Sequence, residues 1–267
     1  MTWERLSGWL QGPMDRKAWE AVIPSMGYMA LLRNLRNFEE AGVRSKVLDR
    51  VAERLADPDE VARSRQLPIR FYSAWGALDS MRFGPALERA LELSLQRVPS
   101  LPGRTLVLVD ASGSMKTPMS ARSAVEWWQV AALFGLALAK RAEKADVFAY
   151  SNERHAIPLK RSTSILRTIP SFMKWRGAGG GTRTLDVLAS AYDRHDRVVI
   201  VTDEQAFSSE RDPGKIAAPI YTFNVVGYRA GHLPSGRHGR YTFGGLSDAA
   251  FTMLPALDAL RDGAWPF

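Results

Sequence analysis

A breaker-rich segment, Pro99-Ser-Leu-Pro-Gly103, divides the 267-residue sequence into two parts whose apolar residues repeat differently. Before it, apolar residues recur at helical spacing, as between Trp19 and Met26, and no alternation typical of a strand is found. After it, continuous runs of β-forming residues alternate with helical segments. Because proline and glycine interrupt helices and strands, we place a domain boundary here, between an all-α segment at residues 1–99 and an α/β domain at residues 100–267.

The first part is predicted to consist of short helices. One apolar stripe runs from Met29 to Phe38, and another from Val47 to Leu55 ends at Asp57-Pro58, where the aspartate can cap the next helix. Short helices joined by Pro, Gly and Asp turns are typical of HEAT-like helical hairpins stacked side by side. No sequence period is visible, so a compact bundle stays open as the alternative.

The second part alternates strands and helices. Thr105–Val109 is an uninterrupted run of β-forming apolar residues, as expected for a strand buried on both faces of a parallel sheet. Further strands are predicted at residues 146–150, 198–201 and 219–226, and helices at residues 123–144, 164–173, 182–193 and 249–260. The alternation predicts a Rossmann-like, doubly wound sheet, in which ligands bind at the carboxyl ends of the strands.

Oxygen-bearing side chains follow the predicted strands at three places. Asp110, Ser112 and Ser114 come directly after the first strand, Thr182 follows the glycine-rich run at residues 177–181, and Asp203 follows the strand at residues 198–201. Hydroxyls with one or two carboxylates form a hard-oxygen set suited to a divalent ion such as Mg²⁺. Mostly neutral ligands leave the ion electrophilic, so an acidic group from a partner can occupy an open position.

Each of these segments also has an ordinary structural interpretation. A Ser-Gly-Ser turn is commonly only a turn, a glycine run only a loop, and an aspartate after a strand only a helix cap. Other motifs fail: residues 177–182 lack the Gly-Lys-Ser/Thr of a phosphate loop, Ser112 is not in a Gly-x-Ser-x-Gly elbow, and the four histidines form no i, i+4 pair. The histidines are expected in loops or at the surface.

The composition is that of an ordinary globular protein, with 46% apolar residues and no cysteine, which excludes disulfides and thiolate metal sites. The longest apolar stretch, Val130–Ala139, is too short to cross a bilayer, so we expect no membrane contact and a cytoplasmic location. The net charge of +8, from 36 basic and 28 acidic residues, suits a polyanionic partner but also an ordinary solvated surface.

The pattern Asp-x-Ser-x-Ser, then a distant Thr, then an Asp resembles the metal-ion-dependent adhesion site of the von Willebrand factor A domain. The matching residues are Asp110, Ser112, Ser114, Thr182 and Asp203. The resemblance covers residues 101 to about 262 and implies a central sheet wrapped by helices, in which the serines and threonine ligate the ion directly or through water.

The helix Met29-Ala-Leu-Leu-Arg-Asn-Leu-Arg-Asn-Phe38, preceded by Trp19–Met26, resembles the end of the helical-repeat region of the Ro autoantigen (TROVE) family. Helical repeats followed by an A domain is also the Ro order. The resemblance implies a ribonucleoprotein component that binds small noncoding RNAs and misfolded RNAs, in bacteria alongside exoribonucleases. A full member has several hundred residues of repeats, whereas this chain has about 100, so it is either a C-terminal piece or a short form.

We therefore expect a Ro-like RNA-binding protein, active in RNA quality control, with a metal-dependent docking A domain. RNA-binding residues cannot be assigned, and no catalytic residue is predicted, because no general base, nucleophile or redox group accompanies the metal ligands. The alternative is a protein-interaction module in which a partner's acidic side chain completes the metal sphere without RNA. Metal-assisted hydrolysis would need a second carboxylate; Glu204 is the one nearby, and strand alternation predicts that it points away.

Overall fold

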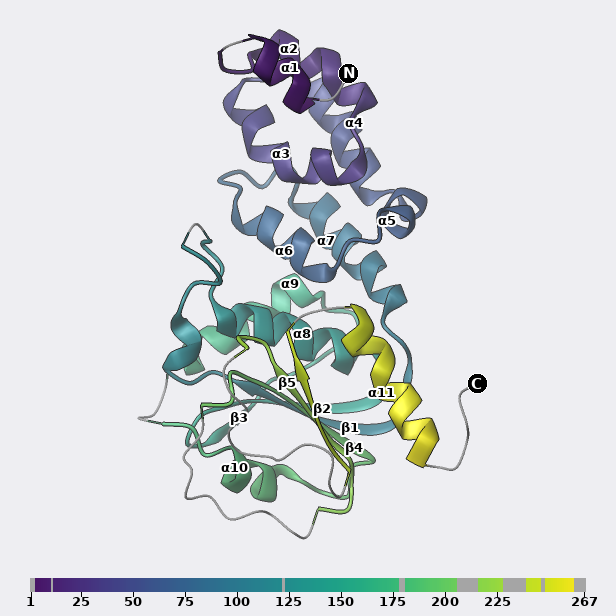
Figure 1. The fold of residues 1–267 in the computed structure, drawn as a ribbon, viewed down its shortest axis with the longest axis vertical. Helices are drawn as coiled ribbons and strands as arrows, with labels where there is room; N and C mark the ends of the chain where they lie inside the picture. Colours follow the sequence, from purple (N-terminus) through teal and green to yellow (C-terminus); the bar gives the residue numbers. More distant parts are fainter. Residues whose placement is uncertain are drawn as a thin grey trace. The chain divides into compact units, whose positions relative to one another are not determined.

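The computed structural model of the chain separates into two units, Met1–Gln96 and Arg97–Phe267 (Figure 1). The boundary predicted between residues 99 and 100 lies close to this division. The structure describes residues 3–10, 12–121, 123–177, 181–205, 216–227, 239–245 and 248–261. No helix within these ranges combines the length and apolarity that a bilayer crossing requires.

The first unit is helical. Its α-helices are α1 (Trp3–Leu10), α2 (Arg16–Val22), α3 (Tyr28–Glu40), α4 (Ser45–Ala56), α5 (Pro58–Ser64), α6 (Pro68–Gly76) and α7 (Gly84–Ser94), with single 3₁₀ turns at Ile23–Ser25 and Leu95–Arg97. Asp57 caps α5 as predicted, because its carboxylate accepts a hydrogen bond from the Glu60 amide at 2.7 Å and Pro58 occupies the first turn.

Apolar side chains fill the centre of the helical unit. Phe38 of α3 is completely buried and meets the Trp19 ring edge-on, with ring centroids 5.0 Å apart. Tyr28 packs its ring against Phe71, while its hydroxyl donates to the Leu55 carbonyl at 2.7 Å. The periodic apolar residues of the sequence thus supply the core, and one buried tyrosine links three helices.

The second unit is an α/β sandwich. Its strands are β1 (Leu101–Asp110), β2 (Ala142–Tyr150), β3 (Arg154–Ala156), β4 (Arg197–Thr202), β5 (Ile220–Asn224) and β6 (Arg240–Gly244); its helices are α8 (Trp127–Arg141), α9 (Ile165–Thr168), α10 (Thr184–Ala191) and α11 (Asp248–Arg261), with 3₁₀ segments at Ser114–Lys116 and Ile169–Trp175. The strand order is β3-β2-β1-β4-β5-β6, and all pairs are parallel except β2 with β3. Strand β2 therefore lies on one side of β1, and β4, which comes later in the chain, lies on the other side.

Successive residues of each strand face opposite sides of the sheet, and helices cover both sides. Helix α8 lies so close to the sheet that a Cβ on Gly135 would come within 2.7 Å of the Val109 side chain. On the other face, Leu188 of α10 packs in one cluster with Leu106 and Leu108. Figure 1 shows α8 and α11 on one side of the strands and α10 on the other. The sheet is buried on both faces, as the uninterrupted apolar strands predict.

The element boundaries differ from prediction in a few places. The helix predicted over residues 123–144 ends at Arg141, because Ala142–Lys144 already pair with β1 in the sheet. The helix predicted from residue 164 changes to 3₁₀ geometry at Ile169, where Pro170 follows. Strands β3 and β6 were not predicted; both are short and lie at the edges of the sheet.

Candidate metal centre

The carboxyl ends of β1 and β4 bring two of the predicted residues to one place. The strands are parallel neighbours, with Val109 opposite Val201, so Asp110 ends one strand and Asp203 follows the other at the same edge of the sheet. The strand order reverses at this place, because β2 lies on one side of β1 and β4 lies on the other. Ligands of doubly wound sheets bind at such a position.

Asp110 is completely buried and held by two hydrogen bonds. Its Oδ1 accepts from the Ser112 amide at 2.9 Å and its Oδ2 from the Thr202 hydroxyl at 2.6 Å. Burial raises the pKa of Asp110 to about 6; the hydrogen bonds from Ser112 and Thr202 oppose the rise, and the nearby charge of Asp203 adds to it. A nearby cation would reverse this shift and favour the carboxylate.

The two predicted serines lie side by side. The Ser112 and Ser114 hydroxyl oxygens are 3.2 Å apart, within hydrogen-bond distance. Ser112 is buried, whereas Ser114, at the start of the 3₁₀ turn, is partly exposed. The pair therefore runs from the buried Asp110 toward solvent.

The two carboxylate oxygens of Asp203 differ in their hydrogen bonding. Its Oδ1 accepts a hydrogen bond from the Gln205 amide at 3.0 Å. Its Oδ2 is buried and has no hydrogen-bond partner among the described residues. Buried carboxylate oxygens are normally satisfied, so this oxygen marks a place where a cation or a water fits.

Thr182 is also buried, but no hydrogen bond within the described part of the chain joins it to the other four predicted residues. Its neighbours hold it near the end of β2: the Arg183 amide donates to the Ser151 carbonyl at 3.0 Å, and the Thr184 and Tyr150 hydroxyls are 3.3 Å apart. Within the preceding glycine-rich run, residues 178–180 lie outside the described residues.

Gly177, at the start of that run, is fixed beside the first loop. Its amide donates to the Ala111 carbonyl at 2.5 Å, and its φ of +68° lies in the left-handed region. A Cβ here would also collide with the Lys116 side chain. The left-handed φ therefore favours glycine at this position, where the glycine-rich run meets the loop that holds Ser112 and Ser114.

Thr202 is the residue that sequence reasoning missed. Besides donating to Asp110, its hydroxyl oxygen accepts from the Glu204 amide at 3.0 Å, so it links the loops after β1 and β4. The argument that Glu204 points away by strand alternation fails, because β4 ends at Thr202 and Glu204 has a left-handed φ of +60°. The Glu204 carboxylate accepts instead from the Asn224 side chain at the end of β5, at 3.2 Å.

The histidines and the acidic residues offer no other centre in the described part of the chain. His155 lies in the edge strand β3, is partly exposed and stacks on Trp175, and His195, although in a loop, is buried with its Nε2 2.9 Å from an Asp146 oxygen. His232 and His238 lie outside the described residues. Across the described ranges no three His, Cys, Asp or Glu side chains gather at metal-binding distance, so a metal here would depend on hydroxyl ligands.

Comparison with known proteins separates the two units. The TROVE domain model matches residues 1–83. A mouse protein, telomerase protein component 1, is 35% identical over 82 residues, which are 30% of this chain and 3% of that protein. The crystal structure of the Ro (RSR) protein from Deinococcus radiodurans matches 97% of this chain with a TM-score of 0.67 at 18% identity.

The match to that structure covers 59% of the solved Ro protein, so this chain spans about three fifths of it. It confirms the predicted fold class, a helical segment followed by an α/β unit of the von Willebrand factor A type. The TROVE domain model thus matches most of the helical unit, and the chain as a whole shares the fold of the solved Ro protein.

Proposed function

We propose that this chain is a Ro-like RNA-binding protein that recognises noncoding or misfolded RNA in cytoplasmic RNA quality control. The observation that carries the proposal is the joining of a TROVE helical unit to an A-type α/β unit in one chain, as in the solved Ro protein. The net charge of +8 supports a polyanionic ligand. The proposal includes no catalytic step.

Fluorescence anisotropy of labelled RNA titrated with the full chain tests this function. Two probes are used, an oligouridine of about 12 nucleotides, within the range of single-strand site sizes, and a short hairpin. We expect binding whose log K falls linearly with log salt, because phosphate contacts release counterions. Absence of binding to both probes at low salt, or an affinity that salt leaves unchanged, would contradict RNA binding.

We further propose that the A-type unit holds a divalent ion, Mg²⁺, through Asp110, Ser112, Ser114, Thr182 and Asp203. The buried, unpartnered Asp203 Oδ2 and the adjacent serine hydroxyls support this donor set. When bound, the ion supplies an electrophilic centre with an open position for an acidic group of a partner. Asp110 and Thr202 hold the loops in place, and the serine pair extends the site to solvent.

Mg²⁺ titration followed by calorimetry and by thermal unfolding tests the metal site. Mg²⁺ is expected to raise the unfolding temperature of the full chain, and Asp203→Asn to remove that response. Asp186→Asn, an exposed carboxylate in the same unit, is the matched control and should keep it. An unchanged response in Asp203→Asn would exclude Asp203 as a ligand.

A second candidate function is a protein-interaction module without RNA, with an exoribonuclease or another protein supplying the acidic ligand. The partly exposed Ser114 at the site favours it, because a partner side chain can reach this residue. Asp110→Ala separates the two functions. It should abolish Mg²⁺-dependent protein binding, and it should leave RNA affinity unchanged if RNA binds through the helical unit.

A further inference from the structure

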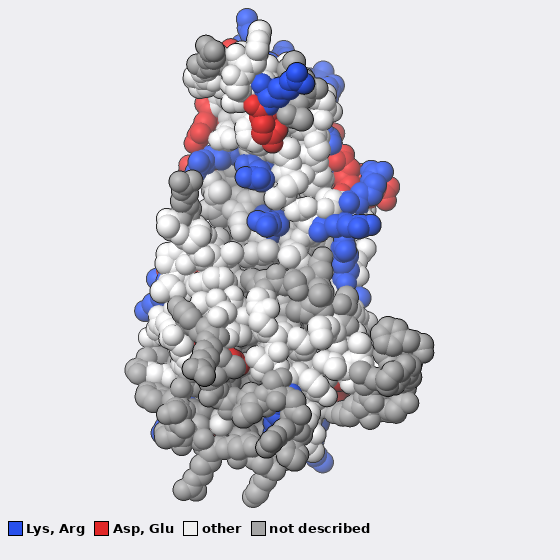
Figure 2. Space-filling view, viewed as in Figure 1, with Lys and Arg blue, Asp and Glu red and all other residues white. Residues whose placement is uncertain are grey.

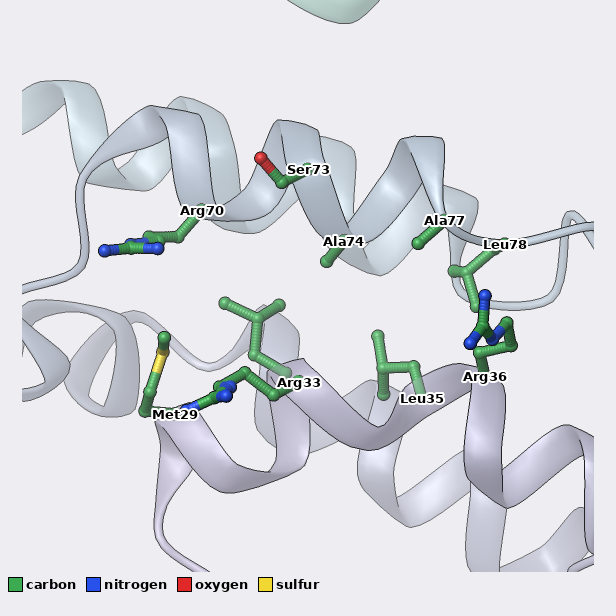
Figure 3. A pocket seen from close by; sticks show the side chains of 10 residues that line it. Met29, Arg33, Leu35, Arg36, Arg70, Ser73, Ala74, Ala77 and Leu78 are labelled. Atoms are coloured by element: carbon green, nitrogen blue, oxygen red, sulfur yellow. The ribbon is translucent and has the colours of Figure 1, made fainter. Parts of the chain in front are cut away.

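A groove lies between α3 and α6 of the helical unit. It encloses a volume of about 400 Å³, within the range of small-ligand sites. Figure 3 shows α3 along one wall and α6 along the other. The lining residues come from these helices and the residues that follow α6: Met29, Leu32, Arg33, Leu35, Arg36, Arg70, Ser73, Ala74, Ala77 and Leu78.

The charge of this groove has one sign. Three arginines line it and no acidic residue does. Arg33 and Arg70 are exposed and form no ion pair with any described residue, whereas Arg36 pairs with Glu40 at 3.3 Å. Both members of that pair are more than half exposed, so the pair contributes little and can open for another anion.

The arginines occupy both walls of the groove. Figure 3 shows the Arg33 and Arg70 side chains extending toward the same end, and Arg36 at the other end beside Leu78. In Figure 2, basic atoms are visible over α3 and α6 in the helical unit. Arg33 and Arg36 are three residues apart, about 4.5 Å along the helix axis, so the positive charges form a row rather than a point.

The Arg-Asn repeat of α3 explains why Arg33 and Arg36 face outward. Asn34 is buried, and its side chain donates to the Ala30 carbonyl at 2.8 Å. Asn37 donates in turn to the Asn34 side-chain oxygen at 2.8 Å. The two asparagines are thus held along the helix by local hydrogen bonds, and the arginine before each of them lies one residue away on the exposed groove side.

We infer that this groove binds the phosphodiester backbone of single-stranded RNA, with Arg33, Arg36 and Arg70 as the phosphate contacts. The inference rests on the RNA binding proposed above and assigns it a place. Guanidinium groups match phosphate oxygens with paired hydrogen bonds, and partly exposed apolar side chains of the groove, such as Met29 and Leu78, give a surface on which bases can lie. The groove also lies wholly within the TROVE-matched residues.

The test compares two double variants of the full chain that remove the same charge. Arg33→Gln with Arg70→Gln changes the groove, and Arg50→Gln with Arg63→Gln removes exposed arginines of α4 and α5 that do not line it. Anisotropy with the oligouridine probe is measured over a range of salt concentrations. The groove variant should lose about tenfold in affinity or more. Its salt slope should fall by about 1.4, for two lost phosphate contacts.

A second readout locates the RNA directly. Because the chain has no cysteine, Ser73→Cys in the groove can be labelled with an environment-sensitive dye, and Ala62→Cys, exposed on α5, serves as the control. Oligouridine should change the dye emission at the Ser73 position and leave that at the Ala62 position unchanged. Polyglutamate is added in a parallel titration to compare an acidic peptide.

The outcomes separate this inference from the proposed function. If wild type binds RNA and both double variants lose affinity equally, or neither does, the groove is not the site although RNA binding stands. If wild type does not bind RNA at all, both fail. If polyglutamate binds the groove as tightly as the oligouridine, the preference for phosphodiester is wrong.

Discussion

The two units differ in what they bury. Among the described residues, the buried polar groups of the helical unit include Asn34, Ser94 and the Tyr28 hydroxyl, and each donates to a backbone carbonyl. The α/β unit buries ionisable groups, among them Asp110, Asp203 and Glu204, at one edge of its sheet. Burying charge is costly unless a partner compensates it. The difference supports the cation proposed at this edge of the sheet, whereas the described acidic and basic side chains of the helical unit are at least partly exposed.

The largest effect on stability is expected from a substitution in the apolar core of the helical unit. Phe38→Ala should lower the free energy of unfolding by about 3–5 kcal/mol, because it removes a fully buried ring that packs against Trp19. Urea denaturation measures the loss. Met81→Ala, at a 72% exposed methionine in the same unit, should change stability by less than about 0.5 kcal/mol. Equal effects would mean that burial does not distinguish these positions.

The buried Asp110 should make the stability of the metal-free protein depend on pH. Its pKa rises from 3.8 to about 6 on folding, so folding favours the protonated form and stability falls as the pH rises from about 4 to above 6. Relative to Asp110→Asn, wild type should lose up to about 3 kcal/mol over that window. Denaturation at pH 4 and pH 7.5 measures the difference, and saturating Mg²⁺ should reduce it. A constant difference would place the carboxyl in a less costly environment.

A smaller effect is expected from the hydroxyl that orients Asp110. Thr202→Val removes the 2.6 Å donation to Asp110 and the acceptor of the Glu204 amide, at a cost of about 1–3 kcal/mol. It should also weaken the Mg²⁺ response measured by calorimetry. Thr222→Val, at another buried threonine on β5, is the control. If both substitutions act alike, the cost is general to buried threonines and not specific to the sheet edge.

The smallest effect concerns a polar contact at the surface of the helical unit. Asp57→Ala removes the cap of α5 and should cost about 1 kcal/mol in thermal unfolding. Asp59→Ala, two residues further on and exposed, keeps the cap and should cost less. A larger loss than in Thr202→Val would weaken the distinction drawn between the two units.

Local patterns sufficed to predict much of the fold. The capped start at Asp57-Pro58 and the apolar run of β1 depend on residues close in sequence, and both are found as predicted. The edge strands β3 and β6 were missed, since each is short and its conformation depends on pairing with a neighbouring strand. The end of α8 was misplaced for the same reason, because Ala142–Lys144 take their conformation from pairing with β1.

The candidate site was predictable to the same degree. Asp110, Ser112 and Ser114 form one loop, and their contacts follow from their spacing. The role of Thr202 depends instead on the register of β1 against β4, and that of Glu204 on a left-handed backbone after the strand. Neither is visible without the sheet. The position of Thr182 is set by contacts of its neighbours around β2 rather than by a hydrogen bond to the other four residues. Its role as a ligand stays a prediction.

The hydrogen bond between Asp110 and Thr202 joins residues 92 positions apart in the chain. A contact of such separation forms only after the intervening chain has been synthesised and β4 has docked beside β1. The proposed cation site therefore cannot form on a partly made α/β unit. Binding of an ion at this edge would indicate that the sheet is complete. It would also stabilise the folded α/β unit relative to incompletely folded states by mass action.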